Sequence, residues 1–319
     1  MPHKPSWFRD DEVFVSFADT CGINKDGNVL YVIDSSTGKR TETINDRLME
    51  DIDALVAGRP AVTGRWVHRD HLSIGAPRYY DTRFVAALDD LLKQPAFRGF
   101  TARTIGELVD EGFIAKRAGH GSPSADKRGG PVPYIKVSDI RAGQVNINPS
   151  NMVSGIVAQS FWRGPHSGLK PFDLVTPIRA SKNIGEFAVL MPGQEDVVLT
   201  KEMLVLRTTS TAPVDNFFLL WALSLKIVRQ QWNRIVLMQT NREDVGDRYL
   251  EIEIPWTSDE DAARRVSAPF RNYYLGMDEL RRAFTSALAQ DDLHHVFLGI
   301  DESQEIGRAS CRERVYVLV

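Results

Sequence analysis

Apolar positions near the start of the chain follow the period of a short helix. Four of them fall within residues 11–22: Val13, Phe14, Phe17 and Ala18. Gly22 ends this run, so the pattern predicts a helix that stops there. The pair Asp26-Gly27 then predicts a turn followed by a strand at 29–33. Two more helices are predicted, at 46–55 and 84–93.

From residue 104 the pattern changes to short apolar runs separated by Gly, Pro, Asn and Asp. Such runs are typical of strands joined by turns. Strands are predicted at 132–137, 174–178, 187–190 and 203–207.

The first of these strands lies in the stretch GGPVPYIKVSDIRAG, residues 129–143. Its two prolines, Pro131 and Pro133, cannot donate to a strand ladder, so the pattern indicates an edge strand or the start of a strand. Side chains alternate along it, with Ile135 and Val137 on the apolar face. The opposite, polar face is predicted to carry Tyr134, Lys136 and Ser138.

One long amphipathic helix is predicted after Asp215, which is expected to be its N-cap. Apolar side chains recur in it at spacings of three and four: Phe218, Trp221, Leu225, Val228, Trp232 and Ile235. We expect this helix to pack on a sheet with its aromatic rings in the core, and not to form a platform for stacking bases.

The last part of the pattern predicts a strand at 250–254 that ends at Pro255. Ser258 and Asp261 resemble a capping box, and Pro269 is predicted to start or kink a further helical stretch. The apolar stripe of that stretch consists of Phe270, Tyr273, Met277, Leu280 and Phe284. A stripe this regular on a long helix is expected to need a partner helix.

The composition indicates a cellular compartment, and the charged residues are unevenly distributed along the chain. The 319 residues suggest two domains, and 43% hydrophobic residues are ordinary for a protein with a core. Two cysteines, Cys21 and Cys311, make neither a disulfide framework nor a metal site, so a reducing cytoplasm and no membrane association are expected. Residues 1–60 contain 7 Lys and Arg against 11 Asp and Glu, whereas residues 116–183 contain 10 against 3. A basic region on a chain of net charge −3 is typical of a polyanion site or of a solvated basic face.

Motifs for catalysis and for cofactor binding are missing. The sequence contains no G-x-G-x-x-G, no G-x-x-x-x-G-K-[ST], no H-E-x-x-H and no G-x-S-x-G. The histidine pairs His68/His71 and His294/His295 have no third ligand nearby in sequence, so surface roles are expected for them. No catalytic residue and no metal ligand is therefore predicted.

The last residues read as an artefact of DNA handling. The string IGRASCRERV begins at Ile306 and is what results when a common sequencing adapter is translated in frame. Residues 306–319, which include Cys311, are therefore expected to lie outside the natural protein.

Several segments, in this order, resemble the target recognition domain of type I restriction–modification specificity subunits. The resemblance covers roughly residues 101–290. It is carried by these segments: TARTIGELVDEG, GSPSADKRGGPVPYIKVSDIRAG, GLKPFDLVTPIRAS, VVLTKEMLVLR, DNFFLLWAL and LEIEIPW. It implies sequence-specific binding of double-stranded DNA in a restriction–modification or related phage-defence system.

The N-terminal segments VFVSFADTCGINKDGNVLY and NDRLMEDIDAL resemble the closing part of the N6-adenine DNA methyltransferases of such systems. Gly22 and Gly27 hold the places of that family's hairpin glycines, and RYYDTRF resembles the junction between methylase and recognition domain in fused enzymes. The family's Asn/Asp-Pro-Pro-Tyr/Phe motif and its S-adenosylmethionine loop have no match here. S-adenosylmethionine is thus expected only in a longer enzyme, and no cofactor is expected in this chain.

The resemblance implies that loops and edge strands of the recognition domain contact DNA. Lys and Arg side chains neutralise phosphates or reach guanine, and Asn and Gln pair with adenine. The candidate DNA-binding residues are Tyr134, Lys136, Ser138, Arg141, Arg179, Lys182, Asn183, Gln239, Asn241 and Arg242. Solvated turns are the alternative for each of them.

Together these expectations describe an α+β protein. Residues 1–98 would be a small α/β remnant of a methyltransferase domain with a linker. Residues 99–257 would be the target recognition domain with a mixed sheet, and residues 258–300 the long exit helix.

The partners expected are double-stranded DNA, a methylase domain or subunit, fused upstream or separate, and a restriction subunit. One alternative is a free-standing specificity subunit without methylase activity. A second alternative, from another class, is a basic α+β adaptor that binds protein or RNA; duplex DNA and RNA in the same binding assay separate these two classes.

Overall fold

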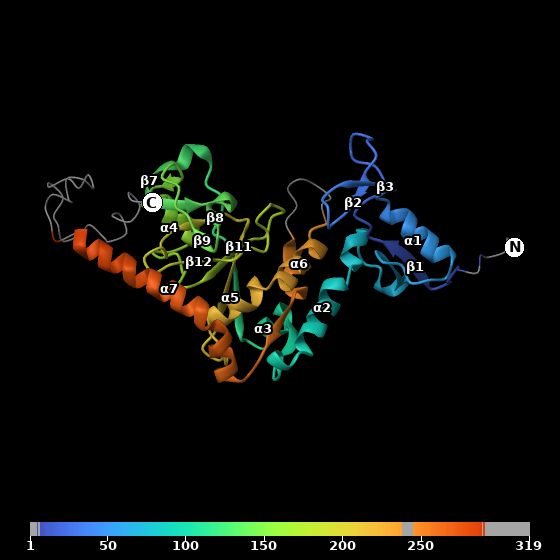
Figure 1. Cartoon of the computed structure of the whole chain (residues 1–319). Coiled ribbons are helices and arrows are strands. Elements are labelled where there is room, and N and C mark those ends of the chain that lie inside the picture. The colour runs from blue at the N-terminus through green and yellow to red at the C-terminus, as the bar shows by residue number, and fades with distance from the viewer. Residues whose placement is uncertain (1–4, 6, 238–244, 289, 291–319) are drawn as a thin grey trace. The chain divides into compact units, whose positions relative to one another are not determined.

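The computed structural model describes residues 5, 7–237, 245–288 and 290 (Figure 1). Several predictions fall outside the described residues: the DNA contacts of Gln239, Asn241 and Arg242, the pair His294/His295, and the adapter-like segment 306–319 with Cys311. The chain divides into two compact units, which are described separately below. The first unit comprises residues 1–84 with 233–237, and the second comprises 85–232 with 238–319.

The first unit contains two small antiparallel pairs of strands and a helix. Strands β1 (Glu12–Ser16) and β4 (Gly64–His68) form one pair, and β2 (Tyr31–Ile33) and β3 (Arg40–Ile44) form the other. The predicted helix at 46–55 is confirmed as α1 (Arg47–Val56), where the Asp46 side chain accepts a hydrogen bond from the Met49 amide at 2.9 Å. Helix α2 (Arg83–Leu92) confirms the prediction at 84–93 and starts at the end of this unit.

The helix predicted within residues 11–22 is wrong, because residues 12–16 form strand β1. Val15 is buried with Val67 and Tyr80 on one face of the β1–β4 pair. On the other face, the Phe14 ring lies edge-on to the Trp66 ring, with 5.5 Å between centroids. Apolar side chains of β1 therefore pack on both faces of the pair, and this cross-strand packing selects the strand.

The turn predicted at Asp26-Gly27 is confirmed. The Asn24 side chain accepts hydrogen bonds from the amides of Asp26 and Asn28, each at 2.9 Å. Gly27 has a φ of +81° and Gly22 has a φ of +78°. Both glycines thus occupy the left-handed region, which a residue with a side chain rarely adopts.

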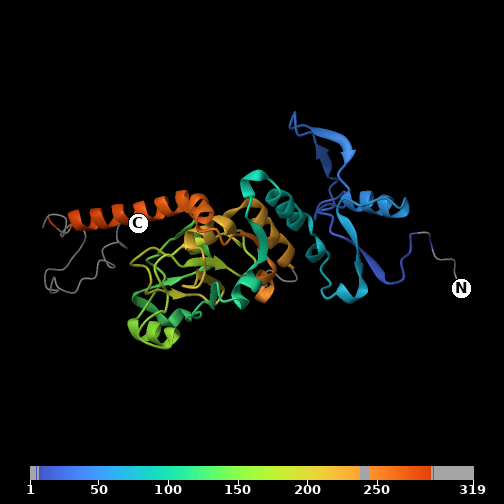
Figure 2. The same cartoon turned by 90° about the horizontal axis from the view of Figure 1, so that it is seen from below.

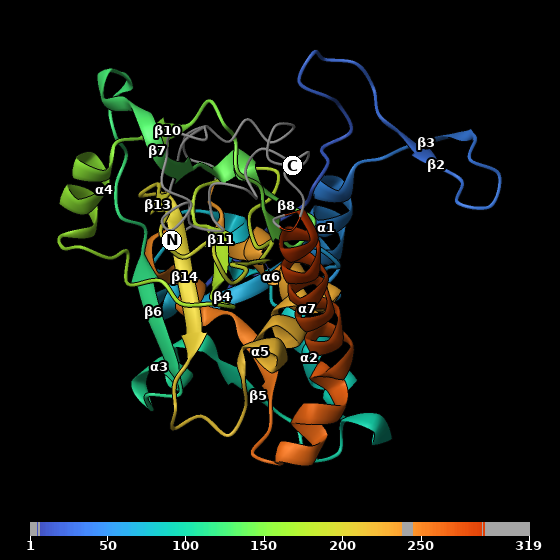
Figure 3. The same cartoon turned by 90° about the vertical axis from the view of Figure 1, so that its left-hand side faces the viewer.

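The second unit is built on three sheets (Figure 3). The largest has the strand order β6-β14-β11-β12-β9-β8, a second has the order β10-β7-β13, and β15 pairs with β5. The bounds of these strands are β5 (Thr101–Thr104), β6 (Ile114–Ala118), β7 (Arg128–Ile135), β8 (Ile140–Arg141), β9 (Gln144–Val145), β10 (Met152–Val153), β11 (Leu174–Pro177), β12 (Ala188–Val189), β13 (Val198–Leu199), β14 (Met203–Thr208) and β15 (Glu253–Trp256).

Four further helices belong to this unit: α3 (Ile105–Asp110), α4 (Gly155–Trp162), α5 (Asn216–Ser224) and α7 (Glu260–Leu288). Helix α6 (Lys226–Ile235) begins in this unit, and its residues 233–235 are assigned to the first unit. The predicted α+β class is confirmed. Its main core lies on one face of the six-stranded sheet, where buried Val175 and Val205 pack with Ile135 and Leu199. Among the described residues, no helix is long and apolar enough to cross a membrane.

Strand β7 corrects two expectations about the stretch at 129–143. It lies between β10 and β13 and is not an edge strand. Its prolines are accommodated because the two neighbouring strands are only two residues long, and β10 pairs with β7 through an irregular register. The strand also ends at Ile135, and a 3-10 turn follows at Val137–Asp139.

The single helix predicted after Asp215 is two helices, because the backbone of Leu225 is extended, with a ψ of 131°. Asp215 is confirmed as the N-cap of α5, since its side chain accepts from the Phe218 amide at 2.9 Å. Helix α5 is buried on almost all sides, whereas α6 buries a stripe that contains Val228 and Trp232. The apolar spacing continues through Leu225, so it gives no signal of the break.

The exit strand and helix also differ from the prediction. Residues 246–251 form a 3-10 helix, and Pro255 lies inside β15, opposite Ala102. Helix α7 is capped by Asp259, which accepts from the amides of Asp261 and Ala262, so the predicted capping box at Ser258 is wrong. Pro269 does not start a new helix, because it lies inside α7. Helix α7 is the long orange-red helix in Figure 2.

Helix α7 packs on α5 and on the turn between β8 and β9. Tyr274 is buried and donates its hydroxyl to the Gly143 carbonyl at 2.9 Å, and Arg271 pairs with Asp215. The predicted apolar stripe lies beside this buried face, with Leu280 74% exposed and Phe284 54% exposed. Its need for a partner helix stays a prediction.

Candidate nucleic-acid interface

The structure brings together two of the segments predicted to contact DNA. The side-chain amide of Asn183 donates to the carbonyl oxygens of Val137 and Ile140, at 2.7 and 2.9 Å. Residues 179–183 therefore lie directly against residues 136–141. Because Asn183 uses its amide hydrogens in these bonds, its role in this arrangement is to hold the two segments together.

Arg141 and Lys182 are the exposed cations of these joined segments. The Arg141 Nε donates to the Ser138 carbonyl at 3.1 Å, which orients its guanidinium group. Neither side chain forms an ion pair with a described carboxylate, and both are exposed. We call Ser138, Arg141 and Lys182 the 138–182 surface.

Arg179 differs from these two residues, because its guanidinium pairs with the Glu202 carboxylate at 2.6 Å. Glu202 is only 12% exposed and also accepts a hydrogen bond from Thr200. This carboxylate neutralises Arg179 locally and holds it against β14. The geometry indicates that Arg179 supports the loop and is not a freely presented cation.

Tyr134 is not on an exposed polar face, which corrects the prediction. Its ring is 4% exposed and packs with Val153, Ala158 and Val198 between α4 and the three-stranded sheet. The reason is that β7 has strands on both sides and α4 across one face. Its ring is therefore not available to stack on a base.

Two cations lie over the Tyr134 ring. Lys136 Nζ is 5.7 Å from the ring centroid and also donates to the Asn151 side-chain oxygen at 2.5 Å. The guanidinium of Arg128 is 5.9 Å from the centroid, and this residue is exposed at the start of β7. Arg128 is not among the residues predicted to contact DNA, although Arg128 lies within the basic region 116–183.

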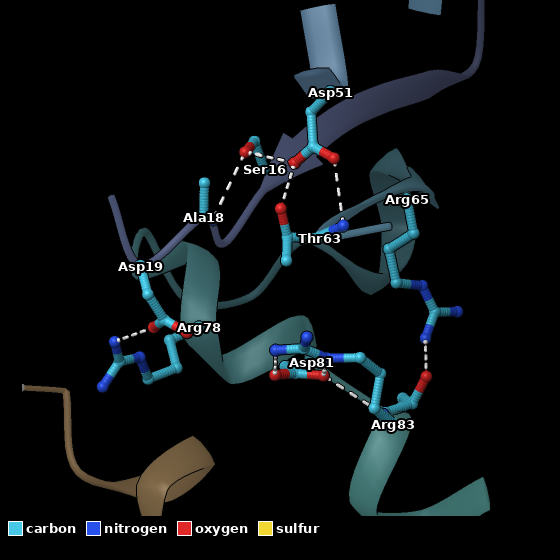
Figure 4. Close-up of polar contacts among 10 residues, drawn as sticks. Ser16, Ala18, Asp19, Asp51, Thr63, Arg65, Arg78, Asp81 and Arg83 are labelled. Carbon is cyan, nitrogen blue, oxygen red and sulfur yellow. Dashed lines mark hydrogen bonds and ion pairs between the residues drawn. The ribbon is translucent and has the colours of Figure 1, made fainter. Parts of the chain in front are cut away.

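Polar side chains in the first unit form a cluster around Asp51 and Asp81 (Figure 4). Asp51 is 1% exposed and accepts from the Thr63 amide at 3.0 Å, from the Thr63 hydroxyl at 2.7 Å and from the Ser16 hydroxyl at 2.8 Å. This carboxylate joins α1 to β1 and to the start of β4. A carboxylate bonded in this way supports the fold, and the described residues contain no cluster of three metal-ligating side chains.

Asp81 plays a similar part where α2 begins. It is buried and receives two hydrogen bonds from the Arg83 guanidinium, at 2.9 and 2.6 Å. These bonds raise the pKa of Arg83, and the negative charges of Asp81, Asp19 and Asp51 raise it further. Asp19 itself pairs with Arg78 at 2.6 Å. Each of the three carboxylates thus has an arginine or hydroxyl partner.

We expect Asp51→Ala to lower the free energy of unfolding of the first unit by about 1–3 kcal/mol, because the buried Thr63 amide and hydroxyl lose their acceptor. Urea unfolding measures this change. Asp53→Ala, an exposed neighbour on the same helix, is the matched control and should change stability by less than about 0.5 kcal/mol. Equal losses in both variants would contradict the role of Asp51.

The remaining predicted features of the first unit have ordinary surroundings. The rings of His68 and His71 lie 5.9 Å apart, and His68 Nδ1 accepts from the Asp70 amide at 3.3 Å. Cys21 is a free, exposed cysteine.

Comparisons with known proteins were made with the sequence and with the structure. No protein-family model matches the chain, and no curated protein matches it. Solved structures are similar over part of the chain, at low identity. The S subunit of the type I restriction–modification system from M. genitalium is 15% identical with a TM-score of 0.37, over 64% of this chain and 46% of that one.

The HsdS subunit from Thermoanaerobacter tengcongensis is 17% identical with a TM-score of 0.35, over 64% of this chain and 46% of that chain. The type IIG restriction endonuclease BpuSI is 12% identical with a TM-score of 0.39, over 69% of this chain and 33% of that chain. The chain therefore spans less than half of the length of each of these proteins.

Proposed function

We propose that the second unit binds duplex DNA in a sequence-specific manner, as the target recognition part of a restriction–modification system. The observation that carries this proposal is the 138–182 surface, where Arg141 and Lys182 are exposed without a described carboxylate partner. Exposed cations on a fixed backbone bind phosphates, and an arginine can also recognise guanine through two hydrogen bonds. We propose DNA and not another polyanion because several segments, in the same order along the chain, resemble specificity subunits.

The proposed site is fixed by packing and is not a flexible basic tail. Asn183 joins its two segments, and the buried Asp139 carboxylate accepts from the Lys136 amide at 2.8 Å. Reading a base edge needs a side chain held in one position, because a misplaced donor loses its partner. Two cations on a fixed backbone, with the Arg141 guanidinium oriented by the Ser138 carbonyl, therefore fit sequence reading better than general attraction of nucleic acid.

We further propose that the first unit is the closing part of an N6-adenine DNA methyltransferase. What supports this is the resemblance of the segments around Gly22 and Gly27, both of which have a left-handed backbone. S-adenosylmethionine and the residues that position the target amine would belong to a longer enzyme, or to a methylase subunit that binds in trans. In this proposal residues 99–257 recognise the target, and α7 (Glu260–Leu288) is the exit helix.

The double variant Arg141→Gln/Lys182→Gln is expected to weaken binding to duplex DNA and to reduce the slope of log K against log salt by roughly two units, because two phosphate contacts are lost. If Arg141 instead reads guanine, its loss costs about 1–3 kcal/mol on the specific site only. Fluorescence titration at several salt concentrations measures both effects, with the specific site first selected from random duplexes.

The matched control is Lys93→Gln/Arg264→Gln, which removes one exposed lysine directly after α2 and one exposed arginine on α7. It changes the net charge by the same amount and should leave the slope nearly unchanged. RNA of the same sequence is titrated in parallel, since preferential RNA binding would favour the adaptor alternative. Equal salt slopes for the two double variants would contradict the proposal that the 138–182 surface binds DNA.

A further inference from the structure

Arg117 is a half-buried cation in an unusual position. It lies on β6, which is an edge strand of the six-stranded sheet. The register pairs Arg117 with Val205 and Ala115 with Arg207, so Arg117 and Arg207 leave the same face of the sheet, on neighbouring strands. That face is the one that carries the main core, and the two arginines lie at its margin.

Backbone lies against the Arg117 guanidinium. A Cβ atom on Gly168 would come within 2.5 Å of Arg117 Nη1, and Gly168 has a φ of +72°. The adjacent Ser167 carbonyl accepts from His120 Nε2 at 2.9 Å, and the Gly168 carbonyl lies 3.4 Å from Arg207 Nη2. The segment at 167–168 therefore passes among three nitrogen-bearing side chains.

The charges at this place do not balance. Asp173 is fully buried and its carboxylate is bound at both oxygens by Arg207, at 2.5 Å each. Among the described residues, no carboxylate, hydroxyl or carbonyl accepts a hydrogen bond from the Arg117 guanidinium. Burial lowers the pKa of Arg117 and the like charge of Arg207 lowers it further, whereas the charge of the nearby Asp173 raises it.

The neighbouring segment adds positive charge and no negative charge. Residues 163–170 read RGPHSGLK, in which Arg163, His166 and Lys170 are exposed and no acidic residue occurs. An arginine without a partner beside a second arginine is unfavourable unless an anion neutralises it. A bound anion would neutralise Arg117 at this place.

We propose that Arg117 and the 163–170 segment bind a phosphate group. Phosphate is the ligand class that fits, because a planar guanidinium donates two parallel hydrogen bonds to a tetrahedral oxyanion, and exposed lysine and arginine add charge. The phosphate can come from the DNA backbone, which rests on the proposed function, or from a free phosphate compound.

This site is separate from the 138–182 surface. Arg117 lies on β6 and Arg141 lies on β8, at opposite edges of the six-stranded sheet. The strand register also places Arg117 and Arg141 on opposite faces, because Arg141, Gln144, Val189, Leu174, Leu206 and Lys116 form one row across the sheet. The phosphate site thus adds affinity without reading the same bases.

The first experiment measures phosphate binding directly. Thermal unfolding of the full chain is followed against increasing inorganic phosphate at constant ionic strength, for the parent and for Arg117→Gln. We expect phosphate to raise the unfolding midpoint of the parent, and the apparent affinity of Arg117→Gln to be weaker by on the order of tenfold. The control is Lys116→Gln, which removes a cation from the next residue, whose side chain lies on the other face and pairs with Asp247.

The second experiment separates the two sources of phosphate. If the ligand is the DNA backbone, Arg117→Gln reduces the salt slope of duplex binding by roughly one unit, while Lys116→Gln does not. If Arg117→Gln leaves the salt slope of duplex binding unchanged but weakens the stabilisation of the chain by inorganic phosphate, the ligand is a free phosphate compound. If the parent binds no DNA, the proposed function fails and the phosphate experiment still decides this site. Equal responses of parent and Arg117→Gln in both experiments would overturn it.

Discussion

Arg207→Ala is expected to lower the free energy of unfolding of the second unit by about 3–5 kcal/mol, because it leaves the buried Asp173 carboxylate without its cation. Asp173 is fully buried, and both of its oxygens are bound by the Arg207 guanidinium. Its remaining hydrogen bond comes from the Lys170 amide at 2.9 Å. Urea unfolding followed by circular dichroism measures the loss.

The double variant Asp173→Leu/Arg207→Leu tests the cause of that loss. Replacing both members of a buried ion pair by apolar groups costs less than removing one, since no charge is left unpaired. The double variant is therefore expected to be more stable than Arg207→Ala. A loss below about 1 kcal/mol in Arg207→Ala would contradict the view that this pair is an essential contact of the core margin.

The second unit is expected to lose about 3 kcal/mol of stability between pH 6.5 and pH 4, because of His120. Its Nε2 donates to the Ser167 carbonyl and its Nδ1 accepts from the Leu199 amide at 3.0 Å, so the neutral ring is the form that fits. Burial, with a smaller effect from the charge of Arg117, lowers the pKa of His120 to about 4, although the hydrogen bond to the Ser167 carbonyl acts in the opposite direction. A proton on Nδ1 would face the Leu199 amide hydrogen.

The direction of the pH effect follows from the two states. The unfolded chain takes up a proton on this histidine below its ordinary pKa of 6.5, whereas the folded chain takes it up only near pH 4. The stabilising contribution is present above pH 6.5 and is lost as the pH falls toward 4, at about 1.4 kcal/mol for each pH unit. Urea unfolding at several pH values measures the slope.

The variant His120→Gln removes the titrating ring and retains an amide donor and an acceptor. It is expected to be less stable than the parent at pH 7, and its stability should fall less steeply between pH 6.5 and pH 4. Parallel curves for parent and variant would show that other groups cause the acid sensitivity.

Elements whose signals are local could be predicted from the sequence. The caps at Asp46 and Asp215 and the turn at Asp26-Gly27 each depend on a few neighbouring residues, and the structure confirms all three. Residues 12–16 show the limit of local pattern, because five residues with apolar Val13, Phe14 and Val15 fit a helix and a strand. Pairing with β4, more than forty residues later, selects the strand.

The candidate site was predicted in part, for the same reason. The exposed cations Arg141 and Lys182 could be found because turns with basic residues are usually at the surface. The burial of Tyr134 could not, because it depends on Val153 and Val198, which come from other strands. Arg117 was not singled out either, since its lack of a partner depends on Asp173 being bound by Arg207.

The side-chain amide of Asn183 fixes two stretches of the chain that are distant in sequence against each other. It is bonded to carbonyls 46 and 43 positions earlier, so residues 136–141 and 179–183 keep one relative position. An engineer who wishes to transplant this surface into another scaffold has to move both stretches together and keep the asparagine. Replacing only Arg141 or Lys182, by contrast, changes the exposed side chains and leaves the hydrogen bonds of Asn183 in place.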